Sequence, residues 1–583
     1  MKRNILFVTA ILSMFAFVSC EDFLDRTPLT EITEEDFFKT AEDLETYSNY
    51  FYTYLKAVYD DIGSDNVSIS TNANDMYTMV NSDGITVNNI GDWDKKDWEK
   101  LRSINYMLVN INYDEISATI EDIRHYEGIA RFFRADFYYE KVKKYSAVPW
   151  YSKPLGTEDP EMYKASDPRT VVVDSIIRDL EFATSHIKED LGSRTRINRY
   201  AALTLMARIC LHEGTFRKYH TSLNLQNTAD TFLDKAIWAC EEIMKSNKFE
   251  VYGNNADDYG AMFCSSKLNN NKEMILIEES DEALGKANNT HTVLGLYWGL
   301  SHDLMLDYQM EDGTPYADLK ADGTMKSYLE VFENRDPRFR QTFVYPGFKE
   351  SPQNEPYMIE LLRGGFIQLK YFPKDENQRK GWNRNYTSVP LFRYGEVLLI
   401  YAEAKAEKGN ISQDDLNKSV NLLRTRVGMP HIQLSGNIIA DIRRERRIEL
   451  ACEGFRLDDI KRWAQGELLG RKPQGIYIFG FGAFDTTGDG VPDVALLPST
   501  ADESAIEDLP EEVKKKLVKE YLVNKDGKET GISLSGADGK SGYIEFITSK
   551  NRKWQDKFYY TPIPRRQTLL NESLIQPPGW ENE

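Results

Sequence analysis

Three aspartates in one short loop are the residues whose type and spacing best suit a metal ion. Asp485, Asp489 and Asp493 carry carboxylates along a stretch in which glycine permits a sharp bend, and calcium prefers such oxygen ligands from a flexible loop. Thr487 stands where a carboxylate or amide is usual, and Leu496 stands where an EF-hand loop has its last glutamate. The favoured interpretation is therefore an Asp/Gly turn, and a calcium site is the alternative. No other cofactor is expected.

Tryptophan and tyrosine in polar, loop-like sequence indicate a second chemistry, the recognition of sugars. An exposed aromatic ring covers the apolar C–H face of a sugar, while Asn, Asp and Arg side chains hydrogen-bond its hydroxyls. The candidate stacking residues are Trp93, Tyr297, Trp298 and Trp382, with Asp75 and Tyr77 as polar partners. For each single ring, packing in the core is the stronger alternative.

Signatures of enzymes are incomplete in this chain. His212 and Glu213 are followed by Gly, Thr and Phe, so the second histidine of a zinc-protease helix is missing. A glycine run from Gly480 lacks the third glycine of a dinucleotide loop, and Leu534 stands where a phosphate loop with Gly539 needs glycine. We therefore expect no catalytic residues. A surface glycoside hydrolase stays open, because 92 acidic residues guarantee chance carboxylate pairs whose separation the sequence does not give.

The net charge of the chain limits the kinds of partner that it can bind. The chain has a formal net charge of -20, which repels a nucleic-acid backbone on average, so we expect no nucleic-acid partner. The densest charged stretch, residues 443–462, holds seven basic and five acidic side chains. We interpret it as scaffold, with Arg446 paired to Glu449 and Glu453 paired to Arg456 if one helix runs through them.

The first residues indicate the cellular compartment in which the protein lies. Lys2 and Arg3 precede an apolar run at residues 5–18, which is too short to span a membrane and is typical of a signal peptide. Cys20 follows this run as the acylated cysteine does in a bacterial lipoprotein. We expect a signal peptide at residues 1–19 and membrane attachment through lipid alone, since more than one acyl chain makes a stable anchor. An ordinary signal peptide with a chance cysteine is the alternative.

The other cysteines, Cys210, Cys240, Cys264 and Cys452, show neither metal-ligand spacing nor a disulfide framework. We expect them to be buried thiols, and a disulfide between Cys210 and Cys240 is the alternative. The 7 histidines likewise form no pair at ligand spacing on one helix face.

Helical periodicity dominates the chain, and the expected helices come in adjacent pairs. Apolar residues recur on one face of each helix, and capping signals such as Thr40 with Asp43 and Ser412 with Asp415 mark the starts. The expected pairs are Thr33–Asp61 with Asp97–Ile111, Ile123–Tyr145 with Val171–Ile187, Asn198–Gly214 with Phe232–Ser246, and Arg393–Gly409 with Ser412–Gly428. We predict a mainly α fold, in which tetratricopeptide-like helix-hairpin repeats form a scaffold with long irregular insertions and a few short strands.

Two irregular segments, residues 252–390 and 470–556, interrupt the helical pattern. Short alternating runs at Glu273–Glu279 and Gly542–Ile547 predict strands within them. Because loops on a rigid scaffold are free to vary, we expect recognition to lie in these segments.

Eight stretches, in this order, resemble the SusD/RagB family of outer-membrane lipoproteins over nearly the whole chain. They are SCEDFLD (19–25), EGIARFFRADFYYEKVKKYSAVPW (127–150), AALTLMARICLHEG (201–214), RDPRF (335–339), LFRYGEVLLIYAEAKAEKG (391–409), LLRTRVGMP (422–430), ERRIELACEGFRLDDIKRW (445–463) and FYYTPIPRRQTLLNESLIQPPGW (558–580). Pro577 departs from the pattern, because the family usually has asparagine at that place in its closing Gln-Asn-Pro-Gly.

The resemblance implies a SusD-like fold with an N-terminal helical region at 20–251 and a C-terminal SusD/RagB region with ligand loops at 252–583. It also implies a surface-exposed lipoprotein that sits as a lid over a SusC-like, TonB-dependent transporter, binds an oligosaccharide and delivers it without catalysis. A peptide ligand is one alternative, because some relatives take up peptides, and a surface hydrolase is another. The family has no fixed ligand motif, so no site residue is carried over from it.

Overall fold

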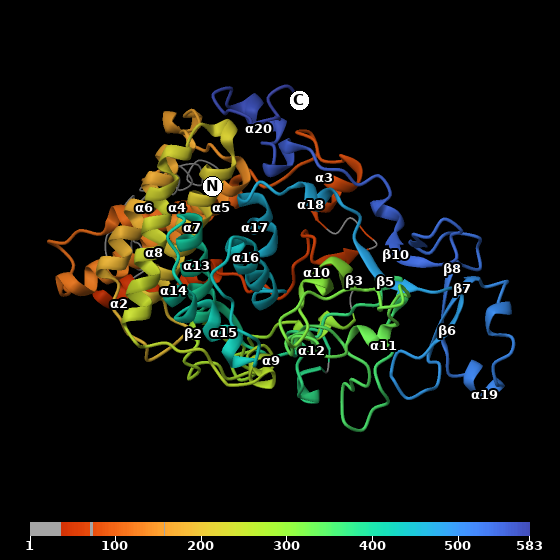
Figure 1. Cartoon of the computed structure of the whole chain (residues 1–583). Helices are drawn as coiled ribbons and strands as arrows, with labels where there is room; N and C mark the ends of the chain where they lie inside the picture. Colours follow the sequence, from red (N-terminus) through yellow and green to blue (C-terminus); the bar gives the residue numbers. More distant parts are fainter. Residues whose placement is uncertain (1–36, 70, 72–73, 157, 296, 380) are drawn as a thin grey trace, which may run out of the picture.

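Long helices fill one half of the molecule, and strands with long loops fill the other (Figure 1). The structure is a computed structural model that describes residues 37–69, 71, 74–156, 158–295, 297–379 and 381–583. The expected signal peptide and Cys20 lie outside the described residues. None of the described helices combines the length and the apolar character that a membrane crossing requires.

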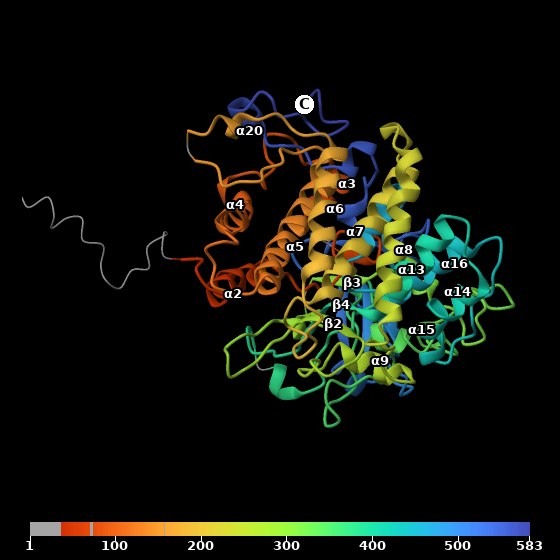
Figure 2. The same ribbon diagram turned by 90° about the vertical axis from the view of Figure 1, so that its left-hand side faces the viewer.

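Five helices of the helical half pack on one another, and four of them confirm the expected second and third hairpins. They are α5 (Ile120–Tyr145), α6 (Arg169–His186), α7 (Arg199–Tyr219), α8 (Ala229–Lys245) and α13 (Tyr394–Glu407). α5 packs on α6, α7 packs on α8, and α13 packs on both α7 and α8. Ala201 and Ala202 of α7 are fully buried, and such small residues let helices approach closely. Figure 2 shows α5 to α8 running side by side.

The first expected hairpin is shorter than predicted. Its elements are α2 (Ala41–Asn49), the 3-10 turn η2 (Tyr50–Tyr54) and α4 (Lys95–Asn110). The predicted capping box is confirmed, because the Thr40 hydroxyl accepts from the Asp43 amide and the Asp43 carboxylate accepts from the Thr40 amide. The helix does not continue to residue 61, since the backbone at Leu55 is extended.

The second helix of the fourth pair is broken. α14 (Gln413–Asn417) starts at the predicted capping box of Ser412 and Asp415, and α15 (Val420–Arg426) begins only after Ser419. The Ser419 hydroxyl donates to the Asp415 carbonyl, the acceptor that a continuous helix would reserve for the amide of residue 419. Our expectation of one continuous helix is wrong at this break.

Short strands form four small sheets in the described part of the chain. The sheets are β1 (Val67–Ile69) with β3 (Trp298–Leu300), β2 (Met274–Glu278) with β4 (Val389–Arg393), β5 (Gln474–Ile478) with β10 (Gly542–Phe546) and β9 (Ile532–Leu534), and β6 (Gly482–Phe484) with β7 (Val494–Ser499) and β8 (Val518–Val523). Neighbours are antiparallel except for β7 and β8, which are parallel. β2 and β10 confirm the two predicted alternating runs.

The remaining α-helices of the described chain lie outside this group of long helices. They are α3 (Asp75–Ser82), α9 (Ala256–Met262), α10 (His302–Asp307), α11 (Tyr328–Val331), α12 (Phe339–Thr342), α16 (Ile438–Glu449), α17 (Arg456–Arg462), α18 (Glu467–Gly470), α19 (Glu511–Lys514) and α20 (Arg565–Leu570). We call the half that contains the strands and long loops the mixed half. In Figure 1, α16 and α17 lie between the helical half and the mixed half. The mainly α fold with a few short strands is therefore confirmed.

Two large apolar cores fill the two halves and meet at α16. Ile442 of α16 belongs to the core of the helical half, and Ile448 belongs to the core of the mixed half. The core of the helical half also contains Leu398 and Tyr401 of α13. This core therefore draws residues from both sides of position 251, where the sequence had suggested a boundary between two regions.

Candidate functional site

Trp93 is a packed residue and not a binding surface. It is only 6% exposed. Its ring meets Trp98 and Tyr145 edge-on at centroid distances of 5.3 and 4.7 Å, and the Lys141 ammonium lies 5.9 Å from its ring centre. Burial, only partly offset by nearby carboxylates, lowers the pKa of Lys141 to about 8. The prediction that Trp93 stacks on a sugar is wrong, because its ring is buried against Trp98 and Tyr145.

Tyr77 and Trp298 are also core residues. The Tyr77 hydroxyl donates to the Ser64 carbonyl at 3.3 Å, and the Trp298 indole N–H donates to Oε1 of Gln368 at 3.1 Å. Burial raises the pKa of Tyr77 to about 12. Neither side chain reaches solvent, so the sugar-contact predictions for both are wrong and the core-packing alternative holds.

Tyr297, Trp382 and Asp75 do lie at the surface. Tyr297 is 45% exposed, and Trp382, at 67%, is the most exposed tryptophan of the described residues. Asp75 is exposed in the first turn of α3. A binding role for these three residues stays a prediction.

The most exposed tryptophan lies on one of two loops that are tied together. We call residues 279–291 loop A and residues 373–387 loop B. Asn385 of loop B is fully buried, and its Oδ1 accepts from the Thr290 hydroxyl at 2.6 Å and from the His291 amide at 2.8 Å. An amide side chain can satisfy several groups at once. Asn385 therefore fixes loop B against loop A.

A second contact holds the loops together next to the exposed ring. Asn289 Nδ2 donates to Asn383 Oδ1 at 3.0 Å, and the Asn383 amide donates to Asn289 Oδ1 at 2.7 Å. Asn383 has a φ of 55°, a left-handed conformation that asparagine tolerates better than most residues. The His291 imidazole lies edge-on to Trp382 at 6.4 Å. Trp382 thus stands on a fixed backbone, which reduces the ordering cost of binding.

A cavity of about 1000 Å³ lies beside these loops, at the upper end of the usual size of ligand sites. We call it the loop cavity. Its lining includes the carboxylates Asp281, Glu282 and Asp375 and the donors Lys267, Gln378, Arg384 and Tyr386. Trp382 precedes Arg384 by two residues but is not part of the lining.

Several polar groups of the loop cavity have no partner in the described part of the chain. Gln378 uses its Oε1 to accept from two buried side chains of loop B, which leaves its amide N–H groups unpaired. The Arg384 guanidinium, the Tyr386 hydroxyl and the Glu282 carboxylate form no hydrogen bond or ion pair with other described residues. The cavity can therefore bind a polar ligand, and its lining contains no histidine or cysteine for nucleophilic catalysis.

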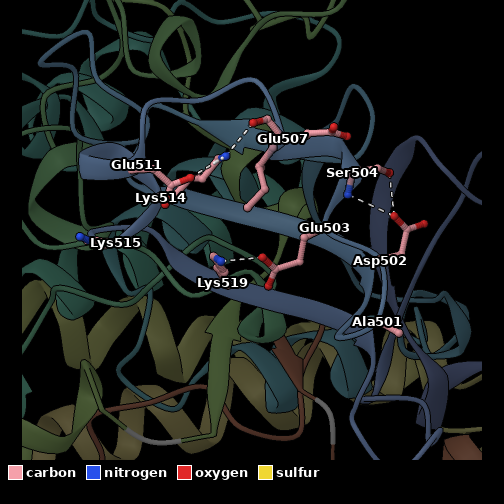
Figure 3. Close-up of a pocket in the computed structure, with 10 residues that line it drawn as sticks. Ala501, Asp502, Glu503, Ser504, Glu507, Glu511, Lys514, Lys515 and Lys519 are labelled. Atoms are coloured by element: carbon pink, nitrogen blue, oxygen red, sulfur yellow. Dashed lines mark hydrogen bonds and ion pairs between the residues drawn. The ribbon is translucent and has the colours of Figure 1, made fainter.

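A second cavity, of about 680 Å³, is lined by side chains between Ala501 and Lys519 (Figure 3). Most of its charges are already paired. Lys519 Nζ lies 2.7 Å from Glu503, and Lys514 Nζ lies 3.1 Å from Glu511. None of its lining residues is aromatic. It therefore offers a sugar neither a stacking ring nor many free hydrogen-bonding groups.

The aspartate loop forms a turn in which the carboxylates bind backbone amides. Asp485 accepts from the amides of Gly488 and Gly490 at 2.6 and 2.8 Å, and Asp493 accepts from the Thr486 amide at 2.9 Å. Backbone donors thus hold the carboxylates of Asp485 and Asp493 in place. Within the described ranges, no group of three or more His, Cys, Asp or Glu side chains is placed to hold a metal ion. These hydrogen bonds fit the Asp/Gly turn, and the calcium alternative, which included Asp489, stays a prediction.

The charged stretch at residues 443–462 is buried, but its pairs differ from those predicted. Arg446 pairs with Asp459 at 2.8 Å, and Arg456 pairs with Asp65 at 2.7 Å. The predicted pair of Arg446 with Glu449 is wrong although both residues lie in α16, because Glu449 binds arginines of other segments instead. The predicted pair of Glu453 with Arg456 is wrong because α16 ends at Glu449 and the chain turns before α17. The stretch binds segments far apart in the sequence, as a scaffold element does.

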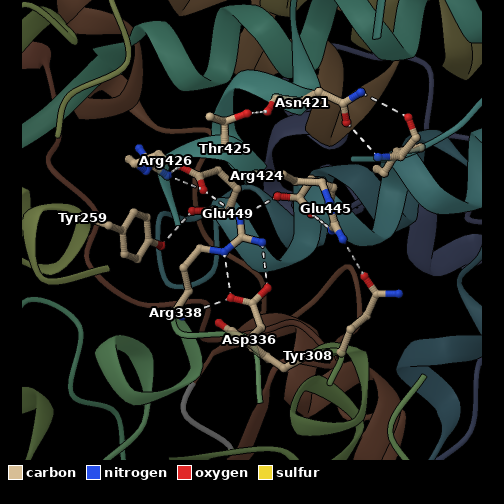
Figure 4. A network of polar contacts seen from close by, with 12 residues as sticks. Tyr259, Tyr308, Asp336, Arg338, Asn421, Arg424, Thr425, Arg426, Glu445 and Glu449 are labelled. Carbon is tan, nitrogen blue, oxygen red and sulfur yellow. Dashed lines mark hydrogen bonds and ion pairs between the residues drawn. The ribbon is translucent and has the colours of Figure 1, made fainter. Parts of the chain in front are cut away.

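Glu449 is the centre of a buried ion cluster, in which it lies between Arg338 and Arg426 (Figure 4). Its carboxylate is 2.7 Å from Arg426, 2.9 Å from Arg393 and 2.9 Å from Arg338. Burial alone would raise the pKa of Glu449, but the three guanidiniums outweigh it and hold the pKa far below the ordinary 4.5. All four side chains are almost completely excluded from solvent, so the cluster is structural.

The four described cysteines are free thiols. Cys210, Cys240 and Cys452 are buried as expected, whereas Cys264 is partly exposed. The alternative disulfide between Cys210 and Cys240 is not formed in this structure.

Sequence reasoning missed loop A and most of the loop cavity. A signal was present, because asparagines cluster at residues 286–290 and again at 382–387, and asparagine often bridges backbone groups in loops. The sequence does not show, however, that these two clusters bond to each other across about ninety intervening residues.

Comparison with family models gives two matches. A model described as the SusD family matches residues 240–580, and a model described as starch-binding associating with outer membrane matches residues 22–211.

Comparison with characterised sequences and solved structures agrees with these matches. SusD-like protein P2 of Formosa agariphila is 22% identical over 513 residues, covering 80% of this chain and 92% of that protein. SusD-like protein P25 of the same organism is 23% identical over 531 residues, covering 78% and 89%. A SusD-like protein of Bacteroides fragilis superposes with a TM-score of 0.69 at 21% identity, covering 95% of this chain and 100% of that one. A SusD-like carbohydrate binding protein of the same species gives a TM-score of 0.66 at 20% identity, covering 92% and 99%.

Proposed function

The chain belongs to the SusD/RagB family, and from this we propose that it is a non-catalytic, cell-surface lipoprotein that captures oligosaccharides and delivers them to a SusC-like, TonB-dependent outer-membrane transporter. The family match at residues 22–211, described as associating with outer membrane, supports the location. A glycan ligand is supported by the similar structure that is described as a carbohydrate binding protein.

The loop cavity is the observation that carries the proposal for this chain. It combines unpaired donors and acceptors, and loop B, which supplies part of its lining, also carries the exposed Trp382. Sugars bind to such surfaces through stacking of their C–H faces and hydrogen bonds to their hydroxyls. We propose Trp382 as the stacking residue, and Tyr297 and Asp75 as further contacts of a longer glycan.

The proposed anchor is the acylated Cys20. It stands at the end of an apolar run in the sequence, and a doubly or triply acylated cysteine would hold the protein to a membrane without a spanning helix. The SusC-like transporter is proposed from family membership alone. Copurification of a coexpressed SusC-like protein with the full-length chain tests this partner.

Glycan capture is tested by titration calorimetry of the mature chain against a library of oligosaccharides. We expect Trp382→Ala to weaken binding about tenfold, since a stacked ring contributes on the order of 1 kcal/mol. Trp238→Ala is the matched control, because Trp238 is 42% exposed on α8 in the helical half. Equal affinity of the two variants would remove the loop cavity as the site.

The two alternatives give different results in the same experiments. A peptide-binding lid would bind library peptides, and sugars would not compete for that binding. A surface glycoside hydrolase would release reducing ends from a bound polysaccharide. Either result would overturn the proposed function.

A further inference from the structure

We propose that the loop cavity selects neutral glycans and rejects glycans that carry carboxylate or sulfate groups. The inference rests on the proposed function, because it specifies the class of sugar that the same cavity takes. It follows from the signs of the charges in the lining and from the hydrogen-bonding groups that stay unpaired there.

The charged groups of the lining favour a ligand without negative charge. Three lining residues are carboxylates, Asp281, Glu282 and Asp375, and two are cationic, Lys267 and Arg384. Lys267 Nζ lies 3.6 Å from Asp281 Oδ2, so these two charges face each other. Of the remaining lining charges, two are negative, Glu282 and Asp375, and one is positive, Arg384, so the lining has an excess of negative charge.

The net charge of the whole chain has the same sign as the excess charge of the cavity. The formal net charge of the chain is -20, and like charges reduce both the rate and the affinity of association, most strongly at low ionic strength. A polyanionic glycan would therefore meet repulsion before it reached the cavity and again inside it.

The unpaired groups of the cavity match hydroxyls in particular. A hydroxyl can donate and accept at once, whereas a carboxylate or sulfate group only accepts. Gln378, Arg384 and Tyr386 offer free donors. Glu282 is a free acceptor, and Asp375 has committed only its Oδ1, which accepts from the Asn377 amide at 2.9 Å.

A neutral sugar can therefore satisfy both kinds of group together. The acidic group of an anionic sugar would satisfy the donors, but it cannot donate to the carboxylates of Glu282 and Asp375 and would lie close to a like charge. This makes Glu282 and Asp375 the residues that determine specificity. Arg384 serves as a donor to hydroxyls, with its charge balanced by these carboxylates.

The test compares neutral and acidic probes by titration calorimetry at low ionic strength. The neutral probes are cello-, manno-, xylo- and galacto-oligosaccharides, and the acidic probes are oligogalacturonates and sulfated galactan fragments. We expect the wild type to bind a neutral probe, and to bind every acidic probe at least about tenfold more weakly.

Variants test whether the lining of the loop cavity causes the discrimination between neutral and acidic probes. Glu282→Gln combined with Asp375→Asn removes both negative charges and keeps the shape of the side chains, so affinity for acidic probes should rise about tenfold relative to affinity for neutral probes. Asp526→Asn combined with Glu529→Gln, in an exposed turn elsewhere, removes the same charge and should change neither.

The outcomes separate this inference from the proposed function. Tighter binding of acidic than of neutral probes by the wild type would overturn the neutral selectivity alone, as would a Glu282/Asp375 variant that behaves like the control. Failure of the wild type to bind any glycan of either class would overturn the proposed function, and the selectivity with it.

Discussion

Arg338 and Glu449 face each other at 2.9 Å with both side chains fully buried, and this contact joins the segment before α12 to the last residue of α16. Arg338 also donates to Asp336 and Glu445, so one guanidinium holds three carboxylates in place. Such a cluster is costly to desolvate and is stable only while every charge has its partner.

Replacing Glu449 by glutamine should destabilise the protein by about 3 to 5 kcal/mol, because three guanidiniums lose the charge that compensates their burial. Chemical denaturation at neutral pH measures this loss. Glu115→Gln is the control, since Glu115 pairs with Lys39 on the surface and should leave the midpoint unchanged. If both variants unfolded at the wild-type midpoint, the cluster would have no structural role.

Glu520 should make stability depend on pH. Its carboxylate is buried and accepts from the Leu362 amide at 3.1 Å. Burial, only partly offset by hydrogen bonds from the amides of Leu362 and Leu361, raises the pKa of Glu520 from the ordinary 4.5 to about 7. The pKa is higher in the folded state, so the stability that the protonated group contributes is present below about pH 4.5 and is lost as the pH rises through 7.

Glu520→Gln keeps the shape of the side chain and removes this titration. We expect the variant to be more stable than the wild type at pH 8 by about 2 to 3 kcal/mol, and to differ little at pH 4.5. Unfolding curves at the two pH values measure the difference. The same stability difference at both would show that Glu520 does not titrate in this range.

Gly214→Ala should destabilise the crossing of α7 and α8. An added Cβ would lie 2.9 Å from two carbon atoms of Leu233 and 3.1 Å from the Ala229 carbonyl oxygen. Alanine favours a helix over glycine by about 1 kcal/mol, but overpacking costs about 1 to 3 kcal/mol, and a backbone carbonyl has little freedom to move. A net loss is therefore expected. Gly436→Ala is the control, because nothing lies within 4 Å of its added Cβ.

Asn385→Ala should loosen the loops around the cavity. It would leave the Thr290 hydroxyl and the His291 amide without their shared acceptor, at a cost of about 1 to 3 kcal/mol. Glycan affinity should fall as well, because loop B would then have to be ordered on binding. Asn270→Ala, at an exposed position, is the control for both measurements. A destabilised variant with unchanged affinity would separate the asparagine bridge from the binding site.

Calcium should have no effect on this protein. The Asp485 and Asp493 oxygens already accept from backbone amides, so neither a chelator nor millimolar calcium should shift the Tm. A calcium-dependent rise in Tm that is lost in Asp485→Ala would show that the loop rearranges to bind the ion.

The sequence predicted the elements of the fold well because helix signals are local. Apolar spacing identified α5 to α8 within a few residues of their ends, and the capping boxes at Thr40 and Ser412 lie where the sequence placed them. Each signal needs only the residues of one or two helical turns. The break at Ser419 was missed because a serine that bonds its own helix resembles any other serine in sequence.

The candidate site was less predictable because it depends on contacts between distant segments. Trp93 stands in polar sequence like that around Trp382, yet it is buried because other segments cover it, as they cover Trp298. The prediction of local ion pairs in the charged stretch, residues 443–462, failed for the same reason. Arg456 pairs with Asp65 and not with the neighbouring Glu453, and nothing local distinguishes the two acidic residues as partners.

The position of α13 in the core of the helical half also bears on how the chain folds. α7 and α8 are complete at Lys245, but α13, which covers part of their apolar faces, begins only at Tyr394. A growing chain therefore exposes these faces until α13 has been made, and exposed apolar helices of this kind are prone to aggregate. The core of the helical half is complete only when α13 has been made, so the order of synthesis delays the folding of the helical half.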